Sequence, residues 1–313
     1  MSAAVDVRTA AVVGAGAIGC SWTALFLAKG LDVAATDPRP GAEAELRSFI
    51  AQAWPALEDL GLAPGASPDR LRFSGDLEDA CAGADFVQEN ASEDEALKVQ
   101  LMARIDAAVR PEAPIASSSS ALTVTTMQQA CAHPERVVLG HPFNPPHLLP
   151  LVEVAGGEKT SVEALDRAEA FYVALGKTPV RLHREVYGHI ANRLQAAVFR
   201  EAVHLLETGV ASLTDIDTAM TQGPGLRWAL MGPFLTFHLA GGQGGMRHFM
   251  RQFAPMQTRI WADLGTPDID DPMLQQRVIT AMDEALNGRT IDDLAADRDR
   301  RFIGLLGCRN AVE

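Results

Sequence analysis

The sequence predicts an α/β fold in which a doubly wound, mostly parallel sheet is followed by a second, all-helical domain. In the first part of the chain, short apolar runs alternate with helical patterns, which is typical of βα units around a parallel sheet. The glycine-rich segment GAGAIG, residues 14–19, lies between the first apolar run and the first helical pattern. Near residue 186 the alternation ends and long helical runs begin. We therefore divide the chain into domains 1–186 and 187–313.

The apolar runs predict seven strands in the first domain, at residues 10–13, 33–36, 84–88, 114–117, 136–141, 149–154 and 178–182. Helical patterns fit residues 16–29, 41–60, 93–108 and 161–175, and we expect Pro55 to break the second helix. In the second domain, the segments around 188–208 and 226–240 are apolar over much of their surface. Ile190, Leu194 and Val198 recur near helical spacing, which predicts a buried face.

The segment GAGAIG has the pattern of a Rossmann-type dinucleotide site. Gly14 would permit the tight turn after the strand, Gly16 would let the backbone approach a pyrophosphate, and Gly19 would let helix and strand pack closely. The amino terminus of the following helix attracts phosphate charge. A glycine-rich turn without a ligand is the alternative, but the strand before and the helix after favour a nucleotide.

The end of the second apolar run indicates which nucleotide is bound. Asp37 follows this run, where an acidic residue would bind the ribose hydroxyls of NAD. A carboxylate there would repel the 2′-phosphate of NADP. The only arginine nearby is Arg39, which is displaced by two residues and follows Pro38. The sequence therefore predicts NAD as the cofactor.

Composition restricts the possible partners. The 313 residues are 47% hydrophobic, which is enough for a large core, and the net charge is −13 without any basic block. Nucleic acids and anionic membrane surfaces are therefore not expected partners. The four cysteines lack metal or disulfide spacing, and the histidines form no HExxH or paired Cys/His pattern, so no metal site is expected.

Residues 9–28 form an uncharged run long enough for a membrane span or a signal sequence, but the glycines within it argue against both. No cleavable leader is recognised before the first strand. With the scattered cysteines, this predicts a cytoplasmic protein.

A histidine and a glutamate lie on two apolar runs joined by a proline-rich turn, in GHPFNPPHLLPLVEV. His141 and Glu153 can therefore face each other across the two strands. A carboxylate that accepts a hydrogen bond from one imidazole nitrogen fixes the tautomer and leaves the other nitrogen free to accept a proton. This pair is a candidate general base with the residue that orients it.

Two further polar elements are candidates for the same site. The serine run 117–120 follows the strand at 114–117, and open α/β sheets place their ligands at the carboxyl ends of strands. Asn192 lies in the opening turn of the second domain's first helix. Taken alone, a serine run is usually a solvated loop and such an asparagine is usually a cap.

These segments together resemble the L-3-hydroxyacyl-CoA dehydrogenase superfamily, through GAGAIG, ASSSSAL, GHPFNPP, LVEV and GHIANRL in this order. Within it, HPFNPPHLLPLVEV and GPGLRWALMGPFLTFHL are similar to the lambda-crystallin or L-gulonate 3-dehydrogenase branch, whereas GGQGGMRHFMRQF is similar to carnitine 3-dehydrogenases. The resemblance implies catalytic residues at Ser120, His141, Glu153 and Asn192. It also implies cofactor contacts at Ala17, Ile18, Asp37, Glu93 and Lys98.

We therefore expect an NAD-dependent dehydrogenase that oxidises the 3-hydroxyl of a small L-3-hydroxy acid, with a gulonate-like substrate as the main interpretation. Carnitine or a 3-hydroxyacyl-CoA is the alternative. Residues 47–73, between the second and third predicted strands, have only three arginines, Arg47, Arg70 and Arg72, and no lysine, which argues against a CoA phosphate site. Arg227 is a candidate for the substrate carboxylate. Phe143, Trp228, Phe237 and Phe249 are candidates for a trimethylammonium group, although such aromatic residues are more often core.

Two other classes of function use fewer of these features. A serine hydrolase would use Ser120, His141 and Glu153 as a triad, but no GxSxG elbow surrounds the serine. A structural, crystallin-like protein would bind NADH without turnover. The apolar helices of the second domain, together with the resemblance, predict a homodimer.

Overall fold

The computed structural model describes residues 7–310, with only the backbone of residues 309 and 310. These residues form two compact units. The first contains the described residues up to Asn192 together with Asp299–Gly307, and the second contains Arg193–Arg298 and the residues after Gly307. The domain boundary predicted at residue 186 remains a prediction.

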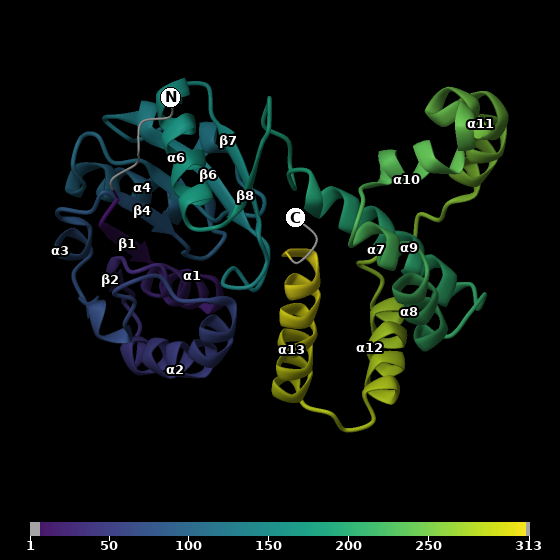
Figure 1. The fold of residues 1–313 in the computed structure, drawn as a ribbon, viewed down its shortest axis with the longest axis horizontal. Helices are drawn as coiled ribbons and strands as arrows, with labels where there is room; N and C mark the ends of the chain where they lie inside the picture. Colours follow the sequence, from purple (N-terminus) through teal and green to yellow (C-terminus); the bar gives the residue numbers. More distant parts are fainter. Residues whose placement is uncertain (1–6, 311–313) are drawn as a thin grey trace. The chain divides into compact units, whose positions relative to one another are not determined.

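The first unit is built on one eight-stranded sheet (Figure 1). Its strand order is β3-β2-β1-β4-β5-β6-β7-β8, and every neighbouring pair is parallel except β6 and β7. The order reverses between β1 and β4, which makes the carboxyl ends of these strands the expected place for a ligand. The strands are β1 (Thr9–Val13), β2 (Asp32–Thr36), β3 (Leu71–Phe73), β4 (Phe86–Glu89), β5 (Ile115–Ser117), β6 (Val137–Pro142), β7 (Leu151–Gly156) and β8 (Thr178–Arg181).

Helices cover the sheet on both faces, and the alternation of side chains along β1 explains why. Ala10 and Val12 belong to one core cluster, and Ala11 and Val13 belong to the other. The first cluster includes α1 (Ala17–Ala28), α2 (Ala42–Leu60) and α6 (Val162–Ala174), and the second includes α3 (Leu77–Cys81), α4 (Glu95–Ala108) and α5 (Val124–Met127). A strand that is buried on both sides needs apolar residues at every position.

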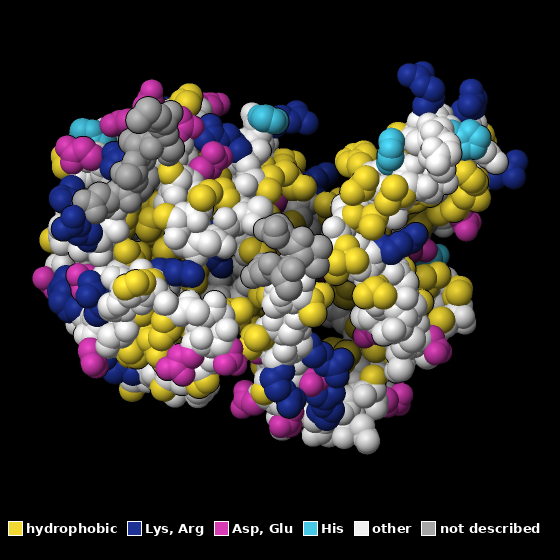
Figure 2. Space-filling view, in the orientation of Figure 1, with side chains coloured by type: hydrophobic (Ala, Val, Ile, Leu, Met, Phe, Trp, Pro, Cys, Tyr) yellow, Lys and Arg dark blue, Asp and Glu magenta, His cyan; other side chains and the backbone are white. Residues whose placement is uncertain are grey.

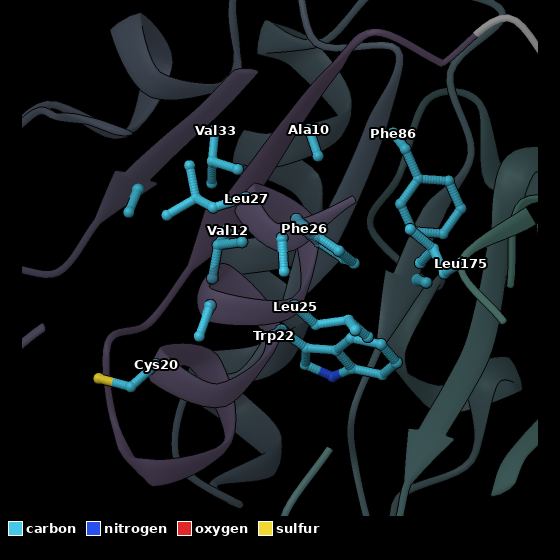
Figure 3. Packing of buried hydrophobic residues seen from close by; sticks show 14 of the residues in the cluster. Ala10, Val12, Cys20, Trp22, Leu25, Phe26, Leu27, Val33, Phe86 and Leu175 are labelled. Carbon is cyan, nitrogen blue, oxygen red and sulfur yellow. The ribbon is translucent and has the colours of Figure 1, made fainter. Parts of the chain in front are cut away.

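The first core cluster is rich in aromatic side chains from α1 and α6. Trp22 and Phe26 of α1 lie with their ring centroids 5.4 Å apart, and Phe26 meets Phe171 of α6 at 5.6 Å. Phe86 of β4 lies 4.1 Å from Phe171. Figure 3 shows these α1 side chains packed beside Val12 and Phe86. This packing fixes α1, and with it the glycine loop, against the sheet.

All seven predicted strands are present, but the break predicted in one helix was wrong and three short elements were not predicted. The helix α2 runs unbroken through Pro55. Its buried residues Leu46, Ile50 and Leu57 lie on both sides of the proline, so their packing outweighs the lost backbone hydrogen bond. The missed elements are the three-residue edge strand β3 and the short helices α3 and α5, which are too brief to show a period.

The second unit is helical in its described residues. Its helices are α7 (Ala191–Glu207, which begins in the first unit), α8 (Leu213–Gln222), α9 (Pro224–Trp228), α10 (Pro233–Ala240), α11 (Gly245–Asp263), α12 (Pro272–Leu286) and α13 (Ile291–Asn310, of which Asp299–Gly307 are assigned to the first unit). Across residues 7–310, no helix combines the length and the apolar character that a membrane crossing requires.

Large apolar side chains are exposed on this unit. Phe234 is 79%, Leu230 71% and Trp261 70% exposed. Figure 2 shows hydrophobic side chains gathered over α10 and α11. The apolar face predicted for α7 is also exposed in this chain, since Leu194 is 56% and Val198 37% accessible. The expected burial of that face is therefore absent within the single chain.

Candidate active site

The glycine loop lies between β1 and α1 and leaves the start of the helix open. Gly14 has φ +91° and donates its N–H to the carbonyl of Thr36 at 2.8 Å, which joins the ends of β1 and β2. A Cβ on Gly19 would lie 1.8 Å from the carbonyl oxygen of Gly14, so only glycine fits there. A Cβ on Gly16 would meet nothing within 4 Å, and no side chain caps α1. The first-turn N–H groups are thus available to an anion.

Asp37 follows β2 and is tied to this loop. Its Oδ2 accepts the N–H of Ala15 at 2.8 Å, and its Oδ1 accepts the backbone N–H of Arg39 at 2.9 Å. The Arg39 guanidinium donates to Asp37, to Glu45 and to the carbonyl of Ala15, at 3.1, 3.1 and 3.2 Å. Arg39 therefore lies beside the acidic residue that is predicted to bind ribose.

His141 and Glu153 are paired directly across β6 and β7. Nδ1 of His141 lies 2.9 Å from Oε2 of Glu153, and both side chains are at least 95% buried. Burial alone would raise the pKa of Glu153, but hydrogen bonds from His141 and from the N–H groups of Ala191 and Ile190 together hold this pKa below its ordinary value. The carboxylate is therefore charged near neutral pH, and it holds the His141 proton on Nδ1.

The other oxygen of Glu153 anchors the start of α7. Oε1 accepts the N–H groups of Ile190 and Ala191 at 2.8 and 2.9 Å. Asn192 is the next residue and lies in the first turn of this helix. A single carboxylate therefore connects His141 to the turn that carries Asn192.

The four serines after β5 have different environments. The hydroxyls of Ser117, Ser118 and Ser119 donate to Glu89, Asn90 and Glu93, at 2.5, 2.7 and 2.9 Å. Ser120 is exposed, and its backbone N–H donates to Glu93. The hydroxyls of the first three serines are thus hydrogen-bonded within the protein. The side chain of Ser120 lies at the surface, where a substrate can reach it.

Lys98 lies beneath these serines in a buried ion pair. Its Nζ lies 2.9 and 3.0 Å from the two carboxylate oxygens of Glu89, and it also donates to the carbonyl of Ala91 at 2.9 Å. The two charged side chains are 1% and 0% exposed. These contacts give the ammonium a structural role, and the cofactor contact that the family resemblance implies at Lys98 stays a prediction.

Comparisons with known proteins agree with this architecture. Residues 9–186 match the family model described as "3-hydroxyacyl-CoA dehydrogenase, NAD binding domain", and residues 188–266 match "3-hydroxyacyl-CoA dehydrogenase, C-terminal domain". The chain belongs to the 3-hydroxyacyl-CoA dehydrogenase family. It is therefore an NAD-dependent oxidoreductase that acts on a CH–OH group, and the hydrolase and purely structural alternatives are set aside.

Members of this family that are similar to the chain span nearly all of it. An L-carnitine dehydrogenase of Streptomyces griseus is 53% identical over 96% of this chain and 90% of its own length. Another of Streptomyces coelicolor is 51% identical over 98% and 96%. A solved 5-formyl-3-hydroxy-2-methylpyridine 4-carboxylic acid 5-dehydrogenase, described as an NAD+-dependent dismutase, has a TM-score of 0.82 and 30% identity, covering 96% of this chain and 97% of its own.

The residues of this dehydrogenase fit NAD. The open side of Gly16 and the uncapped start of α1 suit a diphosphate, and Ala17 and Ile18 begin that helix. The Asp37 carboxylate lies beside the loop, where a ribose diol is expected. Glu93 accepts hydrogen bonds from Ser119 and Ser120, so its predicted cofactor contact would lie next to residues 117–120, which we call the serine turn.

The remaining predicted residues fall into two groups. Phe143 lies 5.6 Å from His141, ring to ring and edge-on, so an aromatic side chain adjoins the base. Arg227 and Trp228 belong to α9, and Phe237 and Phe249 pack together at 4.9 Å in the second unit, so their substrate contacts stay predictions. Among residues 7–310, no group of three His, Cys, Asp or Glu side chains is arranged to hold a metal ion.

Two residues of the site were missed by the sequence analysis. Glu89 ends β4 and joins Lys98 to Ser117. The sequence signal that could have identified Glu89 is a carboxylate at the end of a predicted strand, followed by a lysine, Lys98, in the next helix. The other residue is His189, which lies against both His141 and the serine turn.

Proposed function

We propose that this protein oxidises the 3-hydroxyl of L-carnitine to the 3-oxo acid. The buried His141–Glu153 pair, which His189 connects to the turn that carries Ser120, is the observation that supports the dehydrogenase chemistry. The substrate follows from the relatives named L-carnitine dehydrogenase, which are 47–53% identical to this chain. These relatives favour the carnitine alternative over the gulonate-like substrate expected from the sequence.

His141 would act as the general base. Because Glu153 takes the hydrogen bond from Nδ1, the free Nε2 accepts the proton of the substrate hydroxyl. The imidazolium that forms is stabilised by the charged carboxylate, whose lowered pKa keeps it from taking the proton itself. NAD, when bound, supplies the acceptor for the hydride that leaves the carbinol carbon.

Ser120 and Asn192 would hold the substrate oxygen. Ser120 is fixed by the bond from its N–H to Glu93, and Asn192 by the helix start anchored on Glu153. Both side chains come from backbone that is held in place before substrate arrives, which lowers the entropic cost of positioning. In the reverse direction the same donors polarise the carbonyl.

Phe143 supports a cationic substrate. L-carnitine carries a trimethylammonium group one carbon from its hydroxyl-bearing carbon, and an aromatic face attracts such a cation. The ring centroids of Phe143 and His141 lie 5.6 Å apart. A substrate whose hydroxyl meets His141 would therefore bring the group next to its reacting carbon close to the Phe143 ring. Arg227 remains the candidate for the carboxylate of the substrate.

A parallel substrate assay tests this proposal. NADH formation is followed with L-carnitine, D-carnitine, L-gulonate, L-3-hydroxybutyrate and 3-hydroxybutyryl-CoA, and kcat/KM values are compared because their ratio measures transition-state discrimination. We expect L-carnitine to have the highest value. L-3-hydroxybutyrate is the matched control, because it has the same reacting group without the ammonium. Equal or higher kcat/KM with L-3-hydroxybutyrate or L-gulonate would refute the carnitine assignment.

We further propose that the protein is a homodimer and acts in the cytoplasm. The exposed apolar side chains of α9 to α11 support the dimer, because monomeric proteins rarely expose contiguous apolar patches of that kind. The cytoplasmic location is supported by the cysteine pattern alone.

A further inference from the structure

His189 is a buried histidine that the proposed mechanism does not use. It lies between Gly188 and Ile190, immediately before α7, and is 4% exposed. Its φ is +51°, one of two positive values among the described non-glycine residues. Histidine is more often found in this left-handed region than most residues, but the conformation is uncommon and is held only where the surroundings determine it.

The imidazole of His189 contacts two parts of the site. Its Nε2 lies 3.0 Å from the carbonyl oxygen of Ser119, the residue before Ser120. Its ring centroid lies 4.9 Å from that of His141, with the planes tilted by 53°. A backbone carbonyl only accepts hydrogen bonds, so Nε2 of His189 must carry the proton and donate it.

The backbone of His189 connects it to the third part of the site. The next two N–H groups, of Ile190 and Ala191, both donate to Glu153. The left-handed residue His189 therefore comes directly before the two N–H groups that anchor the start of α7 on Glu153. The side chain of the same residue bonds the serine turn. One residue thus lies at the junction of the turn with Ser120, the His141–Glu153 pair and the helix start with Asn192.

The surroundings keep His189 neutral. Burial lowers its pKa, the bond to Ser119 and the carboxylates of Glu153 and Glu93 act in the opposite direction, and a protonated His141 would lower it further. A neutral ring can donate from Nε2 without placing a second positive charge beside the base. His189 also lines a small pocket together with mainly apolar residues, among them Leu122, Leu139 and Ala155, and with one carboxylate, Glu185.

We propose that His189 is a positioning residue of the dehydrogenase site, which sets the serine turn against His141 through its bond to the Ser119 carbonyl. This inference rests on the roles proposed for Ser120 and His141. The bonds to Glu93 hold the Ser119 hydroxyl and the Ser120 N–H, whereas the bond from His189 holds the Ser119 carbonyl. Without it the peptide between these two serines loses one of its restraints, and a displacement of about 1 Å at a positioning group costs about 10²-fold in rate.

Two variants of similar size separate the hydrogen bond from the packing. His189→Phe keeps a ring and removes the donor, whereas His189→Gln keeps an N–H donor at a similar distance from the backbone. Both face the same backbone strain. In His189→Asn, the asparagine tolerates the left-handed conformation but is too short to reach Ser119. This variant therefore also lacks the hydrogen bond, and it does so without introducing a bulky ring. His183→Phe, at an exposed histidine of the same segment between β8 and α7, is the control.

We expect kcat/KM to fall about 10- to 100-fold in His189→Phe and His189→Asn. In His189→Gln, most of the wild-type kcat/KM should be retained, and in His183→Phe kcat/KM should be unchanged. NADH dissociation constants should stay within about twofold of each other, because the cofactor loop is untouched. The acid limb of the pH profile should keep its midpoint, because a neutral positioning residue does not exchange a proton with substrate.

Equal activity of the Phe and Gln variants, or full activity of His189→Phe, would overturn the proposal. A displaced acid limb would also overturn it, because His189 would then take part in proton transfer. All variants are assayed on the substrate that the wild-type protein turns over fastest, so failure of the carnitine assignment does not affect this test. An active His141→Gln variant would instead refute the underlying site.

Discussion

His141 and Glu153 are direct partners across the antiparallel β6–β7 pair, with Nδ1 and Oε2 2.9 Å apart in the buried part of the first unit. The sheet register therefore fixes the geometry of the proposed base more firmly than a loop would. Because β6 and β7 are consecutive strands, their pairing is local in sequence. The other oxygen of Glu153 extends this rigid pair to the start of α7.

Removing either partner should strongly lower turnover and leave cofactor binding intact. His141→Gln is expected to lower kcat by about 10²- to 10⁴-fold, because the proton acceptor is lost. Glu153→Gln should also lower it, because the amide no longer stabilises an imidazolium. NADH fluorescence titration should give dissociation constants close to wild type. His133→Gln, at an exposed histidine, is the control, and unchanged turnover in both site variants would reject the assignment.

The buried pair Lys98–Glu89 should contribute strongly to folding. Lys98→Met leaves an unpaired carboxylate in the core and is expected to reduce the free energy of unfolding by about 3–5 kcal/mol. Arg47→Ala, which removes the exposed Arg47–Glu43 pair, should cost no more than about 1 kcal/mol. Urea denaturation measures both. Similar losses in the two variants would contradict a structural role for Lys98.

Much of the first unit could be predicted from the sequence because its signals are local. The alternation of apolar runs with helical patterns places seven strands, and the position of Asp37 follows from the end of one run. The hairpin that pairs His141 with Glu153 depends on two neighbouring strands and one turn. Such features need no knowledge of distant contacts.

The parts that were missed depend on packing between distant segments. The contact of His189 with Ser119 joins residues 70 apart, and no period or motif in the sequence indicates it. Pro55 was expected to break α2, but apolar side chains on both sides of it hold the helix against the core. The apolar spacing along α7 predicted a buried face, but Leu194 and Val198 are exposed in the single chain, and a single sequence does not say which surface would cover them.

Arg39 makes coenzyme preference sensitive to one substitution. Asp37→Ser removes the carboxylate that repels a 2′-phosphate, while Glu45 and the Ala15 carbonyl still hold the guanidinium. We expect the NADPH-to-NADH affinity ratio to rise about 10- to 100-fold, the value of one charge-assisted hydrogen bond. Fluorescence titration with both nucleotides measures this ratio. The rise in this ratio should disappear in the double variant Asp37→Ser/Arg39→Ala. An equal loss of affinity for both nucleotides in Asp37→Ser would contradict the prediction.

The exposed apolar side chains of α9 and α10, and of the turn between them, predict a dimer in solution. Sedimentation of the wild-type protein should give twice the chain mass at micromolar concentration. Replacing Leu230 and Phe234 by Asp should shift the protein to monomer, because two charges would then be buried in the interface. Val162→Asp, at a 60% exposed residue of α6, is the control and should remain dimeric. A monomeric wild-type protein would contradict this prediction.

Lys177 should make stability depend on pH in the neutral to alkaline range. Its Nζ donates to the carbonyls of Pro146 and Leu149 in the turn between β6 and β7 and lies 5.4 Å from the Trp22 ring. Burial, with a smaller contribution from Lys29, lowers its pKa from 10.5 to about 7. Between these values the folded protein has released a proton that the unfolded chain still binds, so unfolding takes up a proton. The free energy of unfolding should therefore rise with pH from 7 upward.

The size of this effect is limited by one proton, about 1.4 kcal/mol for each pH unit. Lys177→Met lacks the titrating group, so the difference in unfolding free energy between wild type and this variant should grow in favour of wild type from pH 7 to pH 9. Urea denaturation at several pH values measures it, with Lys159→Met, at an exposed lysine, as the control. Parallel stability curves for wild type and Lys177→Met would show that Lys177 is charged in the folded protein, held by its two carbonyls and the Trp22 ring.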